Sequence, residues 1–146
     1  LIKSLRRHGV GSNLDYGYNS LLSDDHANQL LFLLSKFDKL QKLRKEVYER
    51  YRKNLPQFTF VGADIPHEPS YHKLVILVEK RDELQDWLKT EGIETKIHYS
   101  KPLDQIGSYP NAESFCKKAI SLPIYPFLKT SEVDIVCKKI RKFYDV

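Results

Sequence analysis

Apolar residues recur every three or four positions over the first long periodic segment of the chain. They are Leu30, Leu33, Leu34, Phe37, Leu40, Leu43, Val47 and Tyr51. This spacing gathers them on one face of a helix. Ser23 can cap its first turn, and Asn54-Leu55-Pro56 marks its end. The pattern predicts one long helix over residues 23–56.

Short apolar runs rich in β-branched residues predict strands in the second half of the chain. The clearest run is Tyr71 to Val78, and weaker ones are Phe58 to Val61 and Ile93 to Tyr99. A fourth, Leu122 to Tyr125, is bracketed by two prolines. Proline has no backbone N–H and restricts a strand to a sheet edge, so we expect this run to be the last, edge strand.

Helical patterns alternate with these strands. Asp82 to Thr90 buries leucine and tryptophan side chains and ends at Gly92, and Pro110 suits the first turn of a helix that extends to Ala119. Thr130 or Ser131 is expected to cap a last helix. The predicted fold class is α/β (α+β), with a long connector helix followed by a small mixed sheet on which helices pack.

Composition places the chain among ordinary globular proteins. It has 146 residues, of which 41% are hydrophobic and 29% charged. The longest apolar run, Leu30 to Leu34, is far too short to cross a membrane. We expect a cytoplasmic protein with no membrane partner. Because the chain starts at Leu1 and contains no methionine, we also expect a segment upstream of it.

The cysteines and histidines do not form a metal-binding pattern. Cys116 and Cys137 lie on apolar helical faces and are expected to be core thiols. The five histidines lack the i, i+4 spacing that places two imidazoles on one helical face. We expect no metal site.

The net charge of +5 is concentrated on the long helix. Between Lys36 and Lys53 the chain has eight Lys or Arg residues and three acidic residues. Such a stripe raises nucleic-acid binding as one alternative, which steeply salt-dependent duplex binding would support. No recognition motif accompanies the stripe, and basic helical faces are mostly solvated, so no nucleic-acid partner is expected.

Five local motifs follow one another in an order that indicates a family. They are Leu5-Arg6-Arg7-His8-Gly9; Gly17-Tyr18-Asn19-Ser20; Arg81-Asp82-Glu83-Leu84 with Gly92-Ile93; His98-Tyr99 with Pro102-Leu103; and Pro110-Asn111-Ala112-Glu113 with Leu122-Pro123-Ile124-Tyr125-Pro126. With these motifs the chain resembles the carboxy-terminal portion of the DegT-type sugar aminotransferases. These are fold-type I pyridoxal-phosphate enzymes that aminate keto sugars attached to nucleotides.

The resemblance implies a division of the chain and a set of partners. Residues 1–22 would end the large cofactor domain and form an interface loop, 23–56 would be the connector helix, and 57–146 the small C-terminal α/β domain. The lysine that binds pyridoxal phosphate would lie in the upstream large domain, so no catalytic residue is expected in this chain. The full enzyme would be a homodimer through Gly17 to Asn19 and the connector helix, in polysaccharide biosynthesis, with glutamate as the amino-acid donor.

The resemblance also implies three kinds of contact. Asn19 would reach across the dimer interface and bind the cofactor phosphate; the alternative is a side chain that caps its own loop. His98 and Tyr99 would hold the sugar nucleotide; the alternative for His98 is an imidazole bound to a carbonyl. His72 is a further substrate-binding candidate, although strand alternation can turn it inward.

Two positions depart from the family pattern. Leu21 stands where the family commonly has an arginine, and Ser100 stands where a proline is usual. Leucine cannot replace the bidentate phosphate contact of a guanidinium group. These departures leave the sugar, the nucleotide and the aminated carbon open. They also keep a second hypothesis open, a non-catalytic oligomerisation or regulatory module of the same fold.

Overall fold

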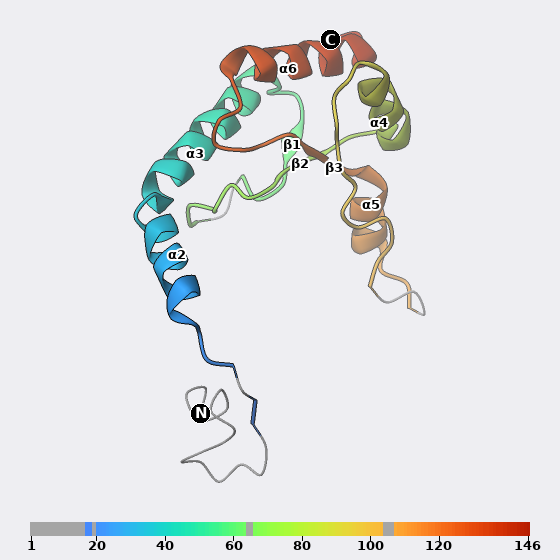
Figure 1. The fold of residues 1–146 in the computed structure, drawn as a ribbon. Coiled ribbons are helices and arrows are strands. Elements are labelled where there is room, and N and C mark those ends of the chain that lie inside the picture. The colour runs from blue at the N-terminus through green and yellow to red at the C-terminus, as the bar shows by residue number, and fades with distance from the viewer. Residues whose placement is uncertain (1–16, 19, 64–65, 104–106) are drawn as a thin grey trace. The chain divides into compact units, whose positions relative to one another are not determined.

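The computed structural model describes residues 17–18, 20–63, 66–103 and 107–146 (Figure 1). The chain divides into two compact units, Leu1–Asp38 and Lys39–Val146. No helix in the described part is long and apolar enough to cross a membrane. The domain boundaries expected at residues 22 and 56 stay a prediction.

The segment predicted as one long helix contains two. Helix α2 spans Asp24–Leu34 and begins as expected, because the Ser23 hydroxyl accepts a hydrogen bond from the His26 backbone N–H at 3.3 Å. Helix α3 spans Phe37–Asn54. The Ser35 hydroxyl donates to the Phe32 carbonyl at 2.7 Å, and the Lys36 N–H donates to Leu33 in a tighter turn. Serine competes in this way with helical hydrogen bonding, and a single helix over 23–56 was a wrong prediction.

Three short strands form the sheet of the second unit, in the order β1-β2-β3. They are β1 (Thr59–Phe60), β2 (Leu74–Leu77) and β3 (Ala119–Leu122). Ile76 at the centre of β2 lies opposite Phe60 on one side and Ile120 on the other. The α+β class is confirmed, and the sheet is antiparallel at both pairings rather than mixed.

The last strand lies three residues earlier than predicted. Helix α5 spans Pro110–Lys118, with Pro110 at its start as expected, and Ala119 opens β3 instead of extending the helix. The strand ends at Leu122 because Pro123 has no N–H with which to continue the ladder. A strand over Leu122 to Tyr125 was therefore a wrong prediction.

The segment 93–99 pairs with β3 only through the bridge between Lys96 and Ser121, whose two N–H···O distances are 3.1 and 2.9 Å. An antiparallel ladder that continued beyond this bridge would next need hydrogen bonds from the backbone of Pro123 on one side and of Ala119 on the other. Pro123 cannot donate, and the Ala119 N–H already donates to the Phe115 carbonyl. The predicted strand from Ile93 to Tyr99 is thus reduced to one bridge.

Helices α4 (Arg81–Thr90) and α6 (Thr130–Tyr144) complete the unit, and α5 lies apart from them at the other side of the sheet (Figure 1). The cap of α6 is Lys129, one residue before Thr130 and two before Ser131, so neither predicted cap residue is the cap. There the Glu132 carboxylate accepts the Lys129 backbone N–H at 2.8 Å, which stabilises the first turn.

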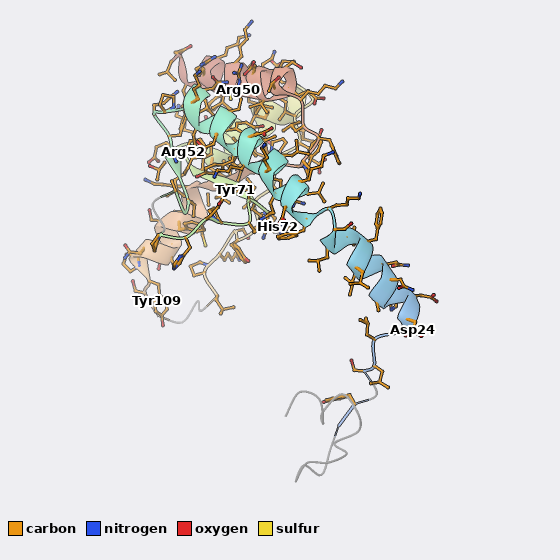
Figure 2. All side chains as sticks on the ribbon, turned by 90° about the vertical axis from the view of Figure 1, so that its left-hand side faces the viewer. Asp24, Arg50, Arg52, Tyr71, His72 and Tyr109 are labelled. Carbon is orange, nitrogen blue, oxygen red and sulfur yellow. The ribbon has the colours of Figure 1, made fainter. Side chains whose placement is uncertain are left out.

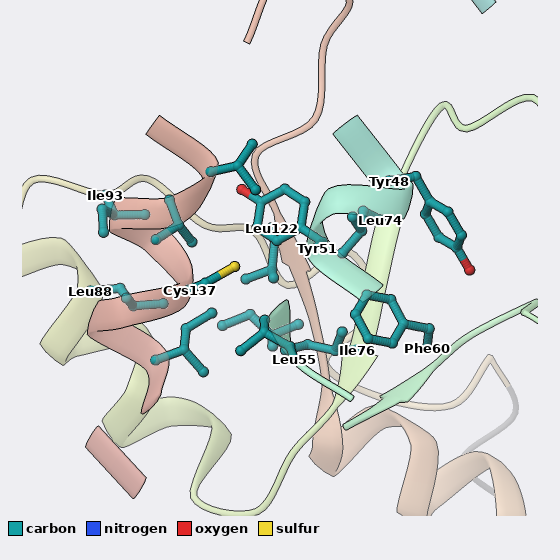
Figure 3. Packing of buried hydrophobic residues seen from close by; sticks show 14 of the residues in the cluster. Tyr48, Tyr51, Leu55, Phe60, Leu74, Ile76, Leu88, Ile93, Leu122 and Cys137 are labelled. Carbon is teal, nitrogen blue, oxygen red and sulfur yellow. The ribbon is translucent and has the colours of Figure 1, made fainter. Parts of the chain in front are cut away.

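The core lies between the sheet and helices α3, α4 and α6 (Figure 3). Its fully buried side chains are Tyr51, Leu55, Leu74, Ile76, Leu84, Leu88, Ile120, Val133, Cys137 and Ile140. Both cysteines are buried free thiols, as expected, and burial raises the pKa of Cys137 to about 11. Burial also raises the pKa of the Tyr51 phenol.

A polar cluster joins α3 to α6. The Arg50 guanidinium donates two hydrogen bonds to the Asp134 carboxylate, at 2.8 and 2.6 Å, and the Asn54 amide donates a third at 2.7 Å. Arg141 donates to the Asn54 carbonyl at 3.2 Å. Bidentate arginine–carboxylate pairs fix geometry as well as charge, so this cluster sets how the two helices cross.

The Asp134→Asn variant is expected to melt at a lower temperature than the wild type at pH 7. The hydrogen bond from Arg50 holds the pKa of Asp134 below its usual value of 3.8. Because folding lowers this pKa, the charged Asp134 carboxylate stabilises the fold above pH 3.8. That stabilisation is lost as the pH falls through the pKa of the folded state. The difference in melting temperature should therefore disappear at about pH 2.

Thermal unfolding followed by circular dichroism at both pH values measures this effect. Asp86→Asn on α4, an exposed carboxylate, is the control and should behave like the wild type at both pH values. An Asp134→Asn protein whose melting temperature is lowered equally at pH 7 and pH 2 would contradict the assignment of the effect to the charged carboxylate.

Candidate functional site

A groove of about 680 Å³ opens where the end of β3 meets the segment after α4 and the first turns of α6. Its polar lining includes His72, Lys73, Lys96 and His98, and Ile124, Leu128 and Ile135 contribute apolar surface. A groove that combines apolar walls with a few converging polar groups is typical of a small-molecule site.

The sheet register explains how distant residues meet in this groove. His72 and Lys73 directly precede β2, whose first residue, Leu74, lies opposite Leu122. Ser121 pairs with β2 on one side and with Lys96 on the other. Since neighbouring strands are about 4.8 Å apart, the segments on either side of β3 are about 10 Å apart. Side chains as long as lysine can close that gap.

His98 is the centre of a cationic environment. Although His98 is exposed, local desolvation lowers the pKa of its imidazole, and the positive charges of Lys73, Lys96 and His72 lower it further. A lowered pKa keeps the ring neutral at pH 7, with one nitrogen that donates and one that accepts hydrogen bonds. Within the described residues no carbonyl accepts a hydrogen bond from this imidazole.

Tyr99 lies beside the groove rather than in its wall. Its ring is 63% exposed, and its centroid lies 6.4 Å from that of His98 at a tilt of 47°. The Lys73 ammonium group lies 5.8 Å from the same ring centroid, within range of a cation–π contact. Lys73 therefore acts on two predicted substrate residues: its ammonium group contacts the Tyr99 ring, and its charge lowers the pKa of His98.

His72 lies next to Tyr71 on the segment before β2 (Figure 2). It is exposed, and it lines the groove together with His98. The structure thus brings together two of the predicted substrate residues, His72 and His98, and does not turn His72 into the core. The predicted cofactor residue, Asn19, lies outside the described residues. Its neighbours Gly17 and Tyr18 are described, and the Tyr18 ring is 71% exposed.

Three groove residues carry chemistry that the sequence reasoning missed, namely Lys73, Lys96 and Tyr125. Lys96 precedes His98 by two residues, a spacing that places side chains on one face of an extended segment and that could have indicated it. Lys73 gave no such signal, because only the pairing of β2 with β3 brings it near His98.

Carboxylates also line the groove, and two of them have partners. Glu91 forms an ion pair with Lys139, and Glu132 accepts the Lys129 N–H. Glu94 is the third. In the described part of the chain, no group of three or more His, Cys, Asp or Glu side chains is arranged to hold a metal ion.

Known proteins resemble this chain along nearly its whole length. A pleiotropic regulatory protein of Geobacillus stearothermophilus is 32% identical over 88% of the chain, and the dTDP-3-amino-3,4,6-trideoxy-alpha-D-glucose transaminase of Streptomyces venezuelae is 28% identical over 97%. A crystal structure of a DegT DnrJ EryC1 StrS aminotransferase from Brucella abortus covers 99% of the chain at a TM-score of 0.88 and 28% identity.

The chain spans only part of these proteins, namely 38% and 42% of the two relatives and 43% of the Brucella protein. Family membership itself rests on a broader match. The model of the DegT/DnrJ/EryC1/StrS aminotransferase family covers residues 1–141. With 141 of 146 residues matched and the same fold, the chain belongs to the DegT/DnrJ/EryC1/StrS aminotransferase family.

Proposed function

We propose that this chain is the carboxy-terminal part of a pyridoxal-phosphate-dependent aminotransferase that aminates a keto sugar nucleotide, with glutamate as the amino donor. Family membership supports the reaction class. The name of the Streptomyces relative, a transaminase for a dTDP-linked sugar, supports the substrate class. The observation that carries the proposal is the groove in which His72 and His98 meet.

In this proposal the chain binds and orients the sugar nucleotide. Imidazole N–H groups and lysine ammonium groups donate to phosphate and sugar oxygens. The Tyr99 ring is exposed enough to stack on a base or sugar ring. Binding energy collected here, away from the reacting carbon, positions that carbon for the chemical step.

The cofactor supplies the electron sink for amino transfer when it is bound. The described residues do not fit its covalent attachment: both lysines of the groove, Lys73 and Lys96, are exposed, whereas an amine nucleophile is activated by desolvation or a neighbouring cation in a closed site. We place that lysine in an upstream large domain, with Asn19 contacting the cofactor phosphate of a second subunit.

The surface of α2 supports such an assembly. Five consecutive residues, Leu30 to Leu34, are each more than half exposed, as are Leu21 and Leu22. Consecutive helical residues point about 100° apart, so these five side chains occupy every side of the helix. An apolar surface of this kind is typical of an interface, and we assign it to the homodimer of a cytoplasmic enzyme.

The test is to express the complete open reading frame that contains this chain and add pyridoxal phosphate. An absorption band of lysine-bound cofactor and glutamate-dependent amination of a keto sugar nucleotide are expected. In that enzyme, His98→Ala should lower kcat/KM for the sugar nucleotide about 10- to 100-fold while the cofactor band persists. His67→Ala, an exposed histidine outside the groove, is the matched control.

A non-catalytic regulatory or oligomerisation module is the second candidate. Two observations favour it: Leu21 replaces the usual arginine, and the Geobacillus relative is named a pleiotropic regulatory protein. Under this candidate the complete protein would assemble but would show neither the cofactor band nor amination. That result would overturn the enzyme proposal.

A further inference from the structure

The backbone of Tyr71 is in the left-handed region, with a φ of 50°, shortly before β2 begins. Two other non-glycine residues in the described part of the chain have a positive φ, Lys80 and Asp145, and both lie at helix ends. Large aromatic residues avoid this region because Cβ comes close to the following carbonyl oxygen. A strained residue at the entry to a strand needs surrounding contacts that compensate for its cost.

Contacts with helix α3 hold Tyr71 in this conformation. Its ring is 7% exposed and packs on Tyr48, with 5.1 Å between the two ring centroids. Its hydroxyl donates to the Glu68 carboxylate at 3.4 Å, and the same carboxylate forms an ion pair with Lys45 at 3.0 Å. Exposed ion pairs contribute little to stability, so burial of the ring is the main stabilising contact.

The turn at Tyr71 reverses the alternation of buried and exposed side chains that β2 follows. Every second side chain is buried from residue 74 on, namely Leu74, Ile76 and Val78. Continued backwards, an extended strand would bury residue 72 and expose residue 71. The structure has the opposite arrangement, because Tyr71 is buried and His72 is exposed. The left-handed residue thus gives the core position to Tyr71 and turns His72 away from it.

His72 and Lys73 are the two residues that follow this turn. Both line the groove, and their positive charges act on His98, on the far side of β3. Tyr71 packs on α3 instead of lining the groove. It therefore affects the groove through the direction in which the next two side chains leave the backbone.

We propose that Tyr71 is a positioning residue, whose left-handed turn, held against α3, directs His72 and Lys73 into the groove. The proposal deepens the proposed function and rests on it only for what the groove binds. Because the Tyr71 ring belongs to the core cluster, the two side chains that follow it start from a fixed point of the fold. Position 71 thus needs a left-handed backbone, and the buried ring is what maintains it.

Two substitutions separate the backbone conformation from the ring. Tyr71→Val and Tyr71→Asn both remove the aromatic packing, but asparagine tolerates the left-handed region and β-branched valine does not. NMR titration of the 146-residue chain measures the pKa of His98 in each folded variant. In Tyr71→Val this pKa is expected to rise toward the usual value of 6.5, because the charges of His72 and Lys73 move away from the ring. In Tyr71→Asn it should stay lowered, as in the wild type.

Two lysine variants calibrate the shift. Lys73→Gln removes the charge that acts most strongly on His98 and should raise its pKa by an amount comparable to that in Tyr71→Val. Lys117→Gln removes an exposed charge of α5 outside the groove and should leave the pKa of His98 unchanged. The other titratable groups of the groove stay in place in all these variants, namely Lys96, Glu91, Glu94 and Glu132.

Circular dichroism verifies that each variant is folded. If Tyr71→Val does not fold, Tyr71→Ala and Tyr71→Gly repeat the comparison with a difference of one methyl group, since glycine enters the left-handed region freely and alanine does not. Then the pKa of His98 should rise in the alanine variant only.

Two results would overturn the positioning role. One is a pKa of His98 that stays at the wild-type value in the valine or alanine variant. The other is an equal rise in both members of a pair, which would assign the effect to loss of the ring and not to the turn. The titration does not measure amination, so the positioning role and the aminotransferase proposal can fail separately.

Discussion

Replacement of Ile140 by alanine is expected to lower the free energy of unfolding by about 3 kcal/mol. Ile140 lies on the inner face of α6, and its side chain is fully buried in the core cluster that contacts α3, α4 and the sheet. Removing three carbon atoms there loses burial of apolar surface and leaves a cavity that the surrounding side chains fill only in part.

The matched control is Ile135→Ala, the same change on the same helix. Ile135 is 54% exposed, so this variant should lose less than about 1 kcal/mol. Urea denaturation followed by the fluorescence of Trp87 measures both values. Equal losses for the two variants would mean that α6 does not present Ile140 to the core.

Replacement of Arg81 by methionine is expected to cost about 2 to 3 kcal/mol of stability. Arg81 is a charged side chain that is only 8% exposed. Its guanidinium donates to the Cys116 carbonyl at 2.9 Å and to the Ala119 carbonyl at 3.4 Å, and its Nε donates to Asp82 at 2.7 Å.

These contacts explain the size of the expected loss. The Cys116 carbonyl lies in the last turn of α5, where carbonyls have no partner within the helix. Methionine fills much of the space of arginine but cannot donate, so buried carbonyls at the junction of α5 and β3 would lose their hydrogen bonds. The expected loss is thus one of polar satisfaction and not of packing.

Arg52→Met serves as the control, because Arg52 is exposed on α3 and its guanidinium carbon lies 6.0 Å from the centroid of the Tyr48 ring. It should lose no more than about 1 kcal/mol. Arg81→Lys should be intermediate, since one ammonium group reaches fewer acceptors than the guanidinium fork. If Arg81→Met is as stable as Arg52→Met, the bonds to Cys116 and Ala119 do not hold this junction.

Several elements could be predicted from the sequence because their signals are local. Helices α4 and α6 follow from apolar periodicity, the start of α5 from Pro110, the start of α2 from the Ser23 cap, and β2 from its β-branched run. The family could be recognised for the same reason, since its motifs are short contiguous segments in a set order. Burial of both cysteines could likewise be predicted, because both lie on apolar faces of predicted helices.

The site was only partly predictable. His72 and His98 were identified as candidates from their motifs and lie in one groove, while Lys73 and Lys96 were missed. Lysine at the surface has no pattern that separates a binding role from a solvated one. What distinguishes these two is that they line one groove and that both charges act on His98, and neither property is visible along a linear sequence.

The sequence alone determined the class, the family, helices α4, α5 and α6 and the central strand, because each depends on residues within a few positions of one another. The tertiary structure alone decided where β3 ends, that residues 93–99 make one bridge, and which side chains surround His98. Strand pairing depends on free N–H and C=O groups in a distant segment. Pro123 has no N–H and that of Ala119 is already bonded, so the ladder stops after one bridge, and the lysines on either side of β3 meet in the groove.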